Sequence, residues 1–362
     1  MKNVLGLFPL TGNGGIASWT KRFLLTFPNN RYNIIPVNVA PDESDSRTGF
    51  MFRAMTGMKA LCRIRKDVLS VIQTNNIQIM HITTSGSLGT LRDYVVNQIC
   101  RKHGIKTIMH CRYGSIPEDY SSKGFLGCLL RKTMHSFDQV WVLDSRSESA
   151  LKTDPTMKDK VYLTPNSIEV PTTCDLSPKK YNKIAFVGNL IPSKGLFELV
   201  EAVVKYDGEI ELSIAGPGPD VVVEKIKCLA GNDLDKRIKI LGKLPNDKAV
   251  ELIKSVDMIA LPTYYSPEAF PISILEAMSR GKLVISCQRA AIKDMLTASD
   301  GTLCGILVRE KSVEEIIKAI KWCQEHKNSA DEICAKAYEK VTSSYRTDVV
   351  YDLYRNLYEK LC

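Results

Sequence analysis

Two glutamates, Glu268 and Glu276, lie eight positions apart in the segment SPEAFPISILEAMSRG, around the start of an apolar helix. Pro271 suits the first turn of a helix, because an N–H at that position would have no acceptor within the helix. Gly281 suits the position directly after the helix end. We therefore predict a helix over residues 271–280. Because the side chains around Glu276 are nearly all apolar, the helix should be buried, and a buried carboxylate needs donors or a charge partner. Sugar or ribose hydroxyls would supply these donors, and so would an internal arginine.

Glycine-rich turns follow three of the expected strands and are typical of anion-binding sites. Gly14 and Gly15 precede the first helix, Gly188 ends the first strand of the second half, and Gly216 follows the next strand. Glycine lets backbone N–H groups approach an anion, and a helix N-terminus favours one. Lys194, at the start of the helix after Gly188, can reach such an anion. Tight packing of the glycines and a solvated lysine are the alternatives.

Two further patterns indicate chemistry that their surroundings disfavour. Residues 12–17 fit a loose dinucleotide fingerprint, but the nearest acidic residue, Asp42, comes too late after the second strand to bind a ribose. Asp233 and Asp235 have a spacing with which metal-dependent sugar transferases hold a divalent cation. They precede a strand, however, and so belong at its amino end, opposite the edge where ligands bind. We expect neither nicotinamide nor metal binding.

The composition is that of an ordinary globular chain with room for two domains. Its 362 residues are 44% hydrophobic and 25% charged. No apolar run approaches the roughly 20 residues that cross a bilayer, and the first segment, MKNVLGLFPLTGNGG, turns glycine-rich too early for a secretory signal peptide. The 11 cysteines show no Cys-x-x-Cys spacing, which favours reduced thiols over disulfides or a zinc site. We therefore expect a cytoplasmic protein.

Positive charge is concentrated in the first half of the chain. Residues 1–168 hold 22 Lys and Arg against 12 Asp and Glu, whereas residues 169–362 hold 27 against 28. Within the first half, residues 52–72 and 123–132 combine basic and apolar side chains in helical patterns. Such a bias indicates an anionic partner: a membrane surface, a phosphorylated acceptor or nucleic acid. A solvated basic surface without a partner explains it equally well.

Short apolar strands alternate with helices along both halves, which open with VLGLFPL and KIAFVGNL. This alternation predicts an α/β fold with parallel sheets covered by helices on both faces. The polar stretch PTTCDLSPKKYN is typical of a linker. We therefore predict doubly wound domains over residues 1–168 and 169–345, with a last helix over about 346–362 that packs back on the first domain. Ligands of such sheets bind beyond the carboxyl ends of the strands, so a cleft between the domains is the expected site.

The order of these motifs resembles a known family. Glu268 and Glu276, followed by AMSRG, are similar to the donor-site signature of retaining glycosyltransferases of family 4, the group 1 glycosyl transferases. The likeness covers nearly the whole chain. Its further motifs are Gly14-Gly15, His110 at a strand end, LTPNSIEV, Lys194-Gly195, IAGPG, ILGKL and Gly305. The resemblance implies a GT-B fold, in which two Rossmann-like domains face one another across a cleft.

The resemblance also implies a role for each residue of the SPEAFPISILEA segment. Glu276 would hold the ribose hydroxyls of a nucleotide, and Glu268 would lie beside the transferred sugar. Backbone N–H groups next to Glu268 would bind the sugar hydroxyls and the diphosphate. The residues at this part of the donor site would be Ala269, Phe270, Pro271 and Ile272.

A cation and a histidine would act near the reacting carbon. Lys194 would neutralise the departing diphosphate, helped by the N–H groups of Gly14 and Gly15. His110 would contact the sugar, although a histidine at a strand end can equally be structural. Arg112 and His81 are candidates for the acceptor side. The remaining donor-site positions would be Gly188, Asn189 and Gly216.

Asn189 departs from the family pattern, which commonly has an arginine directly after this glycine. Losing that cation would remove charge stabilisation from the leaving diphosphate, which is a large effect in a dry site. Either Lys194 and a second basic residue such as Arg112 compensate, or the activity is weaker or more restricted. The asparagine can still donate hydrogen bonds.

The implied activity moves a sugar from a nucleotide sugar, with UDP as the expected nucleotide, to a saccharide or lipid-linked acceptor in cell-surface glycan biosynthesis. Configuration at the anomeric carbon would be retained, the leaving phosphate would take the acceptor's proton, and no metal or other cofactor would be needed. The expected partners are the donor, the acceptor and an anionic membrane surface, at which the protein would be peripheral, and not nucleic acid. A nucleotide-sugar epimerase of the same fold and a non-catalytic sugar-nucleotide binder remain open alternatives, the second because of Asn189.

Overall fold

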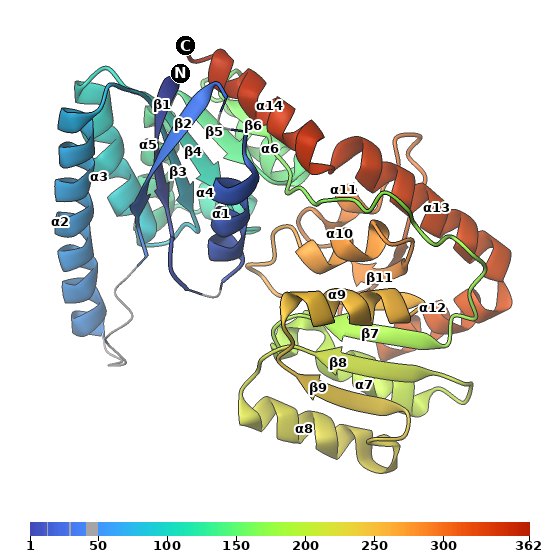
Figure 1. The fold of residues 1–362 in the computed structure, drawn as a ribbon. Helices are drawn as coiled ribbons and strands as arrows, with labels where there is room; N and C mark the ends of the chain where they lie inside the picture. Colours follow the sequence, from blue (N-terminus) through green and yellow to red (C-terminus); the bar gives the residue numbers. More distant parts are fainter. Residues whose placement is uncertain (13, 29, 41–49) are drawn as a thin grey trace. The chain divides into compact units, whose positions relative to one another are not determined.

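The computed structural model describes residues 1–12, 14–28, 30–40 and 50–362, of which 50–55 are described as backbone only. The chain divides into two compact units, coloured along the sequence in Figure 1. The N-terminal unit comprises Met1–Thr164 with Tyr351–Cys362, and the C-terminal unit comprises Pro165–Val350. Asp42, considered above for a dinucleotide site, lies outside the described residues.

The sheet of the N-terminal unit has six parallel strands in the order β2-β1-β3-β4-β5-β6. The strands are β1 (Lys2–Phe8), β2 (Tyr32–Asn38), β3 (Ile77–Thr84), β4 (Lys106–Cys111), β5 (Gln139–Val142) and β6 (Val161–Leu163). The helices are α1 (Gly15–Thr26), α2 (Phe50–Thr74), α3 (Gly89–Lys102), α4 (Ile116–Ser121), α5 (Phe125–Ser136), α6 (Ser145–Lys152) and, beyond its first turn, α14 (Thr347–Glu359). The strand order reverses between β1 and β3, which makes their carboxyl ends a topological switch point.

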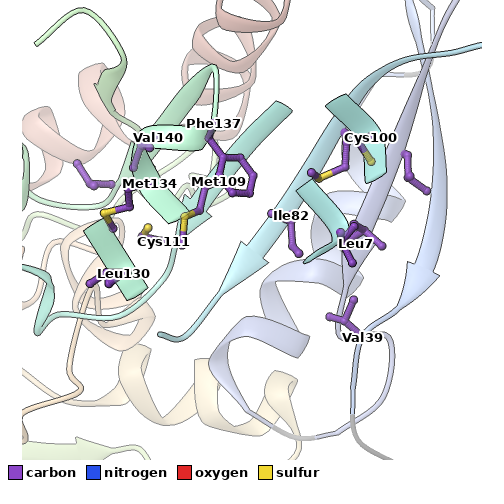
Figure 2. Close-up of a cluster of buried hydrophobic side chains, with 14 of the residues drawn as sticks. Leu7, Val39, Ile82, Cys100, Met109, Cys111, Leu130, Met134, Phe137 and Val140 are labelled. Carbon is purple, nitrogen blue, oxygen red and sulfur yellow. The ribbon is translucent and has the colours of Figure 1, made fainter. Parts of the chain in front are cut away.

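One face of this sheet carries an aliphatic core. Alternate strand residues point to the same face, so Leu7, Ile82, Met109 and Val140 gather with buried side chains of α2, α3 and α5. Figure 2 shows several of these residues together with Phe137. This burial is the main source of stability for the unit.

The opposite face of the same sheet is aromatic and polar. The intervening strand residues Phe8, His81, His110 and Trp141 pack here against rings of α1 and α14. The last helix thus covers one face of the N-terminal sheet, and its buried residues include Tyr354 and Tyr358.

The sheet of the C-terminal unit also has six parallel strands, in the order β12-β11-β10-β7-β8-β9. The strands are β7 (Lys183–Val187), β8 (Glu211–Ala215), β9 (Ile238–Gly242), β10 (Met258–Leu261), β11 (Leu283–Cys287) and β12 (Ile306–Val308). The helices are η1 (Pro192–Lys194), α7 (Leu196–Lys205), α8 (Asp220–Ala230), η2 (Gly231–Asp233), α9 (Asn246–Ser255), α10 (Ile272–Met278), α11 (Ile292–Met295), α12 (Val313–Glu325) and α13 (Lys327–Ser344). Its switch point lies between β7 and β10. The two sheets confirm the predicted α/β class with two doubly wound units.

The helix predicted over residues 271–280 is shorter than expected. Pro271 is the N-cap of α10, with an extended backbone (φ −66°, ψ 120°), and the helix ends at Met278. Gly281 follows in the left-handed region at φ 61°, as expected for a glycine after a helix. A side chain at this position would also meet Leu176 and Cys174.

Within the residues that the structure describes, no helix is both long and apolar enough to span a bilayer.

Candidate functional site

Lys194 and Glu268 form an ion pair at the switch point of the C-terminal sheet. Lys194 follows β7 and Glu268 follows β10, and these strands are neighbours. The Lys194 Nζ lies 3.0 Å from Glu268 Oε2, and the two side chains are only 15% and 11% exposed. Water therefore screens the pair little. The pair brings a cation and an acceptor together where open α/β sheets bind ligands.

The backbone around Lys194 is tightly constrained. Gly195 has φ 76°, and a Cβ at this position would lie 2.1 Å from the carbonyl oxygen of Pro262. The N–H of Tyr264 donates to the carbonyl of Ser193 over 2.8 Å, which joins the loop after β10 to the turn η1. Only glycine fits at position 195, and its conformation fixes where Lys194 stands.

Gly188 and Gly216 let the loops after β7 and β8 touch. A Cβ on Gly216, whose φ is 150°, would lie 1.8 Å from the carbonyl oxygen of Gly188. A Cβ on Gly188 would lie 3.9 Å from Lys194 Nζ, so the ammonium group stands over the bare backbone at the end of β7. Close packing between the two loops therefore explains the glycine at position 216. At position 188, the absence of a side chain leaves room beside the Lys194 ammonium group.

The backbone carbonyl groups of the loop after Glu268 accept hydrogen bonds that fix the loop in place. The Asn166 side chain donates to the carbonyl of Phe270 over 3.0 Å, and the N–H of Ala291 donates to the carbonyl of Ala269 over 3.1 Å. The Phe270 ring is buried and packs edge-on against Tyr345, with ring centroids 5.4 Å apart. In the described part of the chain, the backbone N–H groups of Ala269 and Phe270 have no acceptor. They are therefore available to a ligand.

The buried state expected for Glu276 is wrong. The helix itself is largely buried, through Ile274, Leu275 and Met278, but Glu276 is half-buried. With seven residues in α10, the apolar positions turn toward the sheet and the glutamate lies at their margin.

Asn189 is exposed at the end of β7, and within the described residues its side chain makes no hydrogen bond. Its backbone carbonyl accepts from the N–H of Ile191 over 2.8 Å, which shapes the turn before η1. The asparagine thus lies one residue beyond Gly188 without a fixed partner.

His81, His110 and Arg112 come together in the N-terminal unit. His81 and His110 lie on neighbouring strands, and both side chains are fully buried. His81 Nε2 lies 3.1 Å from His110 Nδ1, and His110 Nε2 lies 3.1 Å from Arg112 NH1. Rings of Trp19, Trp141 and other aromatic residues surround them. The structural alternative for His110 therefore has direct support, and its contact with a sugar stays a prediction.

Burial controls the protonation of this group. Burial, with the positive charge of Arg112, lowers the pKa of His81 to about 3. The same causes, followed by His81 itself, hold the pKa of His110 well below its ordinary value. Burial also lowers the pKa of Arg112 to about 10. Both histidines are therefore neutral at physiological pH, and Arg112, which lies 4.1 Å above the Trp19 ring, is charged.

Gly14 and Gly15 stand at the start of α1, at the carboxyl edge of the N-terminal sheet. Gly14 is the N-cap with φ −79°, and a Cβ on either glycine would meet no atom of the described residues. Neither packing nor backbone conformation therefore requires glycine at these positions.

Asp233 forms an ion pair with Arg237. Its carboxylate accepts two hydrogen bonds from the Arg237 guanidinium, at 2.8 and 2.9 Å, and these bonds lower the pKa of Asp233. Both aspartates precede β9, at its amino end as predicted. Among the residues that are described, no group of three metal-ligating side chains is close enough to hold an ion.

The basic segments of the N-terminal unit are amphipathic helices on its core. In α2, Ile64 and Val68 are buried while Arg65 and Lys66 are exposed. At the start of α5, Phe125 and Leu126 are 78% and 46% exposed. Two of the cations near them are engaged within the chain. Arg131 donates to the carbonyl of Ser122 over 2.7 Å, and Lys132 Nζ lies 5.1 Å from the Tyr94 ring centre.

Sequence reasoning missed Glu198. Its Oε1 accepts a hydrogen bond of 3.1 Å from the Tyr264 hydroxyl, which ties α7 to the loop after β10. Nothing in the helical pattern around Glu198 distinguishes it from a solvated residue of the first turn. It also missed Tyr358, whose hydroxyl lies 2.7 Å from His81 Nδ1, because the two are 277 positions apart.

Residues 175–340 match the family described as Glycosyl transferases group 1. An uncharacterized glycosyltransferase, MJ1069, of Methanocaldococcus jannaschii is 28% identical over 49% of this chain and 45% of its own length. The amylovoran biosynthesis glycosyltransferase AmsK of Erwinia amylovora is 22% identical over 52% of this chain and 50% of its own. The chain thus spans about half the length of these curated relatives.

Among solved structures, Alr3699/HepE of Anabaena in complex with UDP superposes with a TM-score of 0.75 and 15% identity. The match covers 99% of this chain and 100% of that chain. Together with the two sheets described above, this likeness confirms the GT-B type of fold.

Proposed function

We propose that this chain, whose residues 175–340 belong to the group 1 glycosyl transferases, moves a sugar from a nucleotide sugar to an acceptor hydroxyl. The observation that carries the proposal is the shielded pair of Lys194 and Glu268 at the switch point of the C-terminal sheet. A lysine for the diphosphate and a carboxylate for sugar hydroxyls meet there. The matched family segment contains both residues.

The donor would be held from two sides of this pair. Lys194 would exchange part of its contact with Glu268 for the diphosphate oxygens, and Glu268 would accept from the sugar hydroxyls. The N–H groups of Ala269 and Phe270, which have no acceptor in the described part of the chain, would donate to the same hydroxyls or to phosphate. Glu276, half-buried on α10, would bind the ribose. The UDP bound to the Anabaena protein supports UDP as the nucleotide.

The chemistry would be a front-face displacement with retention. The acceptor oxygen bonds to the anomeric carbon as the bond from that carbon to the diphosphate oxygen breaks, and a phosphate oxygen takes the acceptor's proton. No protein nucleophile is needed, so catalysis rests on positioning and charge neutralisation. Lys194 would supply the charge that a metal supplies in other transferases. The engagement of Asp233 by Arg237 supports a metal-independent site.

The N-terminal unit would serve the acceptor. Gly14 and Gly15 leave open space at the carboxyl edge of its sheet, which a phosphate or sugar could approach. Arg112, directly after β4, would add a cation at the same edge of this sheet. We also propose that the exposed Phe125 and Leu126, beside Lys123, touch an anionic membrane surface that carries a lipid-linked acceptor. The amylovoran relative supports a role in cell-surface polysaccharide synthesis.

The test is incubation of the full chain with UDP-, GDP- and ADP-sugars, with nucleotide release and thermal shift as readouts. Nucleotide release that grows with an added acceptor supports a transferase, and NMR of the product's anomeric proton distinguishes retention from inversion. An acceptor-independent change of the sugar would favour the epimerase, and a thermal shift without turnover would favour a non-catalytic binder. No response to any donor would contradict the proposed function.

A further inference from the structure

A continuous line of hydrogen bonds runs through the aromatic face of the N-terminal unit. The Tyr358 hydroxyl lies 2.7 Å from His81 Nδ1. His81 Nε2 lies 3.1 Å from His110 Nδ1, and His110 Nε2 lies 3.1 Å from Arg112 NH1. The line joins α14, β3, β4 and the residue directly after β4. Tyr358, His81 and His110 are fully buried, and Arg112 is nearly so.

Arg112 fixes the direction of every bond in this line. A guanidinium carries donors and no acceptor, so the His110 Nε2 that faces it must be unprotonated. A neutral His110 then carries its proton on Nδ1 and donates to His81 Nε2. By the same reasoning a neutral His81 carries its proton on Nδ1 and donates to the Tyr358 oxygen.

The opposite direction is not compatible with the geometry. If Tyr358 donated to His81, then His81 would donate to His110, and His110 would present an N–H to Arg112 over 3.1 Å. A second proton on either histidine would place two N–H groups opposite each other in the same way. Each alternative leaves buried donors facing each other, which costs free energy without a compensating bond.

We infer that Arg112, His110, His81 and Tyr358 form a one-way hydrogen-bond chain that holds both imidazoles in the neutral Nδ1–H form and makes α14 a positioning element for Arg112. His110 and His81 are thus positioning residues that transmit a constraint. The far end of the chain is a tyrosine from the last helix, and the near end is a cation at the carboxyl edge of the sheet.

A second pair of hydrogen bonds connects α14 to the sheet of the N-terminal unit. The Trp141 indole N–H donates to the Gln139 side chain over 2.8 Å, and the Gln139 amide donates to the carbonyl of Leu357 over 3.0 Å. That carbonyl lies in the last turn of α14, where intrahelical donors are missing. The helix is therefore held at two successive residues, 357 and 358.

The groups around the chain preserve the neutral state of the histidines. Trp19 and Phe23 of α1, Phe8 of β1 and Trp141 of β5 enclose the imidazoles. Among the described residues, the charged and titratable groups that face them are Arg112 and, near Arg112, Arg22, Tyr351 and Tyr354, with Tyr358 at the other end. None of these is a carboxylate that would favour a protonated imidazole.

The direct test is long-range ¹H–¹⁵N NMR of the full chain labelled at histidine, which reports which ring nitrogen carries the proton. His81→Gln and His110→Gln spectra assign the two buried residues. We expect both to carry a proton on Nδ1 only, with unchanged spectra from pH 8 to pH 5. An Nε2–H form of either residue, or uptake of a second proton in this range, would overturn the inference.

Arg112→Met tests whether the arginine sets the direction. Without the obligatory donor, both directions become possible, so the signals of His81 should change although His81 does not touch Arg112. An unchanged Nδ1–H form of both histidines would contradict the one-way chain. If this variant does not fold, the spectra of the wild type still decide the matter.

Tyr358→Phe removes the final acceptor and leaves the arginine in place. We expect it to lower Tm while both histidines keep the Nδ1–H form. Tyr351→Phe, on the same helix but outside the chain, is the matched control and should leave the histidine signals unchanged. If Tyr358→Phe reversed the tautomers while Arg112→Met did not, the direction would be set by the tyrosine and the inference would fail.

Discussion

At the scale of single residues, the structure separates two kinds of polar side chain that look alike in the sequence. Lys194 and Glu268 are half-buried and paired, with their outer faces at a strand edge. His81 and His110 are fully enclosed and bonded to each other. The first kind is the one that we propose exchanges its partner for a ligand. The second kind holds the fold and sets the position of its neighbours.

Removing the lysine should affect turnover more than donor binding. Lys194→Ala removes the charge that we propose stabilises the leaving diphosphate, so we expect kcat to fall by about 10²–10³-fold. Steady-state kinetics with whichever donor proves active in the incubation test would measure this. Lys205→Ala is the matched control, because Lys205 forms an ion pair with Glu201 on the exposed side of α7. Equal effects of the two substitutions would show that the site is misplaced.

The buried histidines should make stability depend on pH below neutrality. The pKa of His81 is lowered to about 3 by burial and Arg112, against about 6.5 in an unfolded chain. Between these values the unfolded chain binds a proton that the folded chain does not, so the free energy of unfolding falls as pH decreases through 6.5. For His81 alone we expect a loss of about 2 kcal/mol between pH 8 and pH 5.

Urea unfolding at pH 8 and pH 5 measures this loss, and a variant comparison isolates the histidine from the carboxylates. His81→Gln should show a smaller difference between the two pH values than the wild type. His103→Gln, an exposed histidine at the end of α3, should behave like the wild type. If all three proteins lost the same free energy, the histidine would not be the cause.

At the scale of elements, glycines shape the loops that follow the strands of the C-terminal sheet. Backbone atoms of neighbouring loops occupy the positions where two of these glycines would otherwise carry a Cβ. Gly195 lies against Pro262, and Gly216 lies against Gly188. These contacts hold the loops after β7, β8 and β10 in one arrangement, so the Lys194 side chain starts from a fixed backbone. Gly14 differs, since the space beside it is open.

Two glycine-to-alanine substitutions should separate these roles. Gly195→Ala places a Cβ 2.1 Å from a carbonyl oxygen at φ 76°, so we expect it to destabilise the C-terminal unit by about 2 kcal/mol or more. Gly14→Ala has neither problem and should change stability by less than about 0.5 kcal/mol. Thermal unfolding of both variants checks this. A stable Gly195→Ala protein would show that the loop after β10 can move.

At the scale of the whole molecule, the two units share a fold type and differ in charge. The excess of basic residues lies in residues 1–168, and much of it is used within the unit, as Arg131 and Lys132 show. The exposed apolar pair Phe125 and Leu126 at the start of α5 therefore indicates contact with a partner more specifically than the charge excess does. Phe125 is 78% exposed, which is unusual for a large apolar side chain without a partner.

Sedimentation with anionic vesicles tests the membrane proposal. We expect the full chain to bind vesicles that contain phosphatidylglycerol more strongly than vesicles of phosphatidylcholine alone. The double substitution Phe125→Ser and Leu126→Ser should weaken this binding about tenfold, since it removes apolar area from the lipid contact. Val221→Ser changes a residue of the C-terminal unit that is 75% exposed and is the matched control. Absence of binding by the wild type would remove the proposal.

The sequence by itself determined the class of fold and led to the donor site that we propose. The alternation of strands and helices is a local pattern, set by side-chain periodicity and turn residues, and it gave two parallel doubly wound sheets. Pro271, Gly281 and Gly195 act on their own backbone, so the start and end of α10 and the turn before α7 could be predicted within a few residues. Lys194 and Glu268 were singled out because each lies at the entry to a helix and matches a motif of the family that the chain resembles.

Only the tertiary structure decided which polar residues are exposed and which meet. The half-buried state of Glu276 depends on how α10 packs, and the enclosure of His110 depends on α1 and on a helix more than 200 positions later. Contacts between residues so far apart in the sequence form because whole faces of helices and sheets are buried together. The hydrophobic effect that drives this burial is non-directional, so it leaves no pattern in the local sequence. For the same reason the chain from Arg112 to Tyr358 could not be predicted, although every residue in it is a common one.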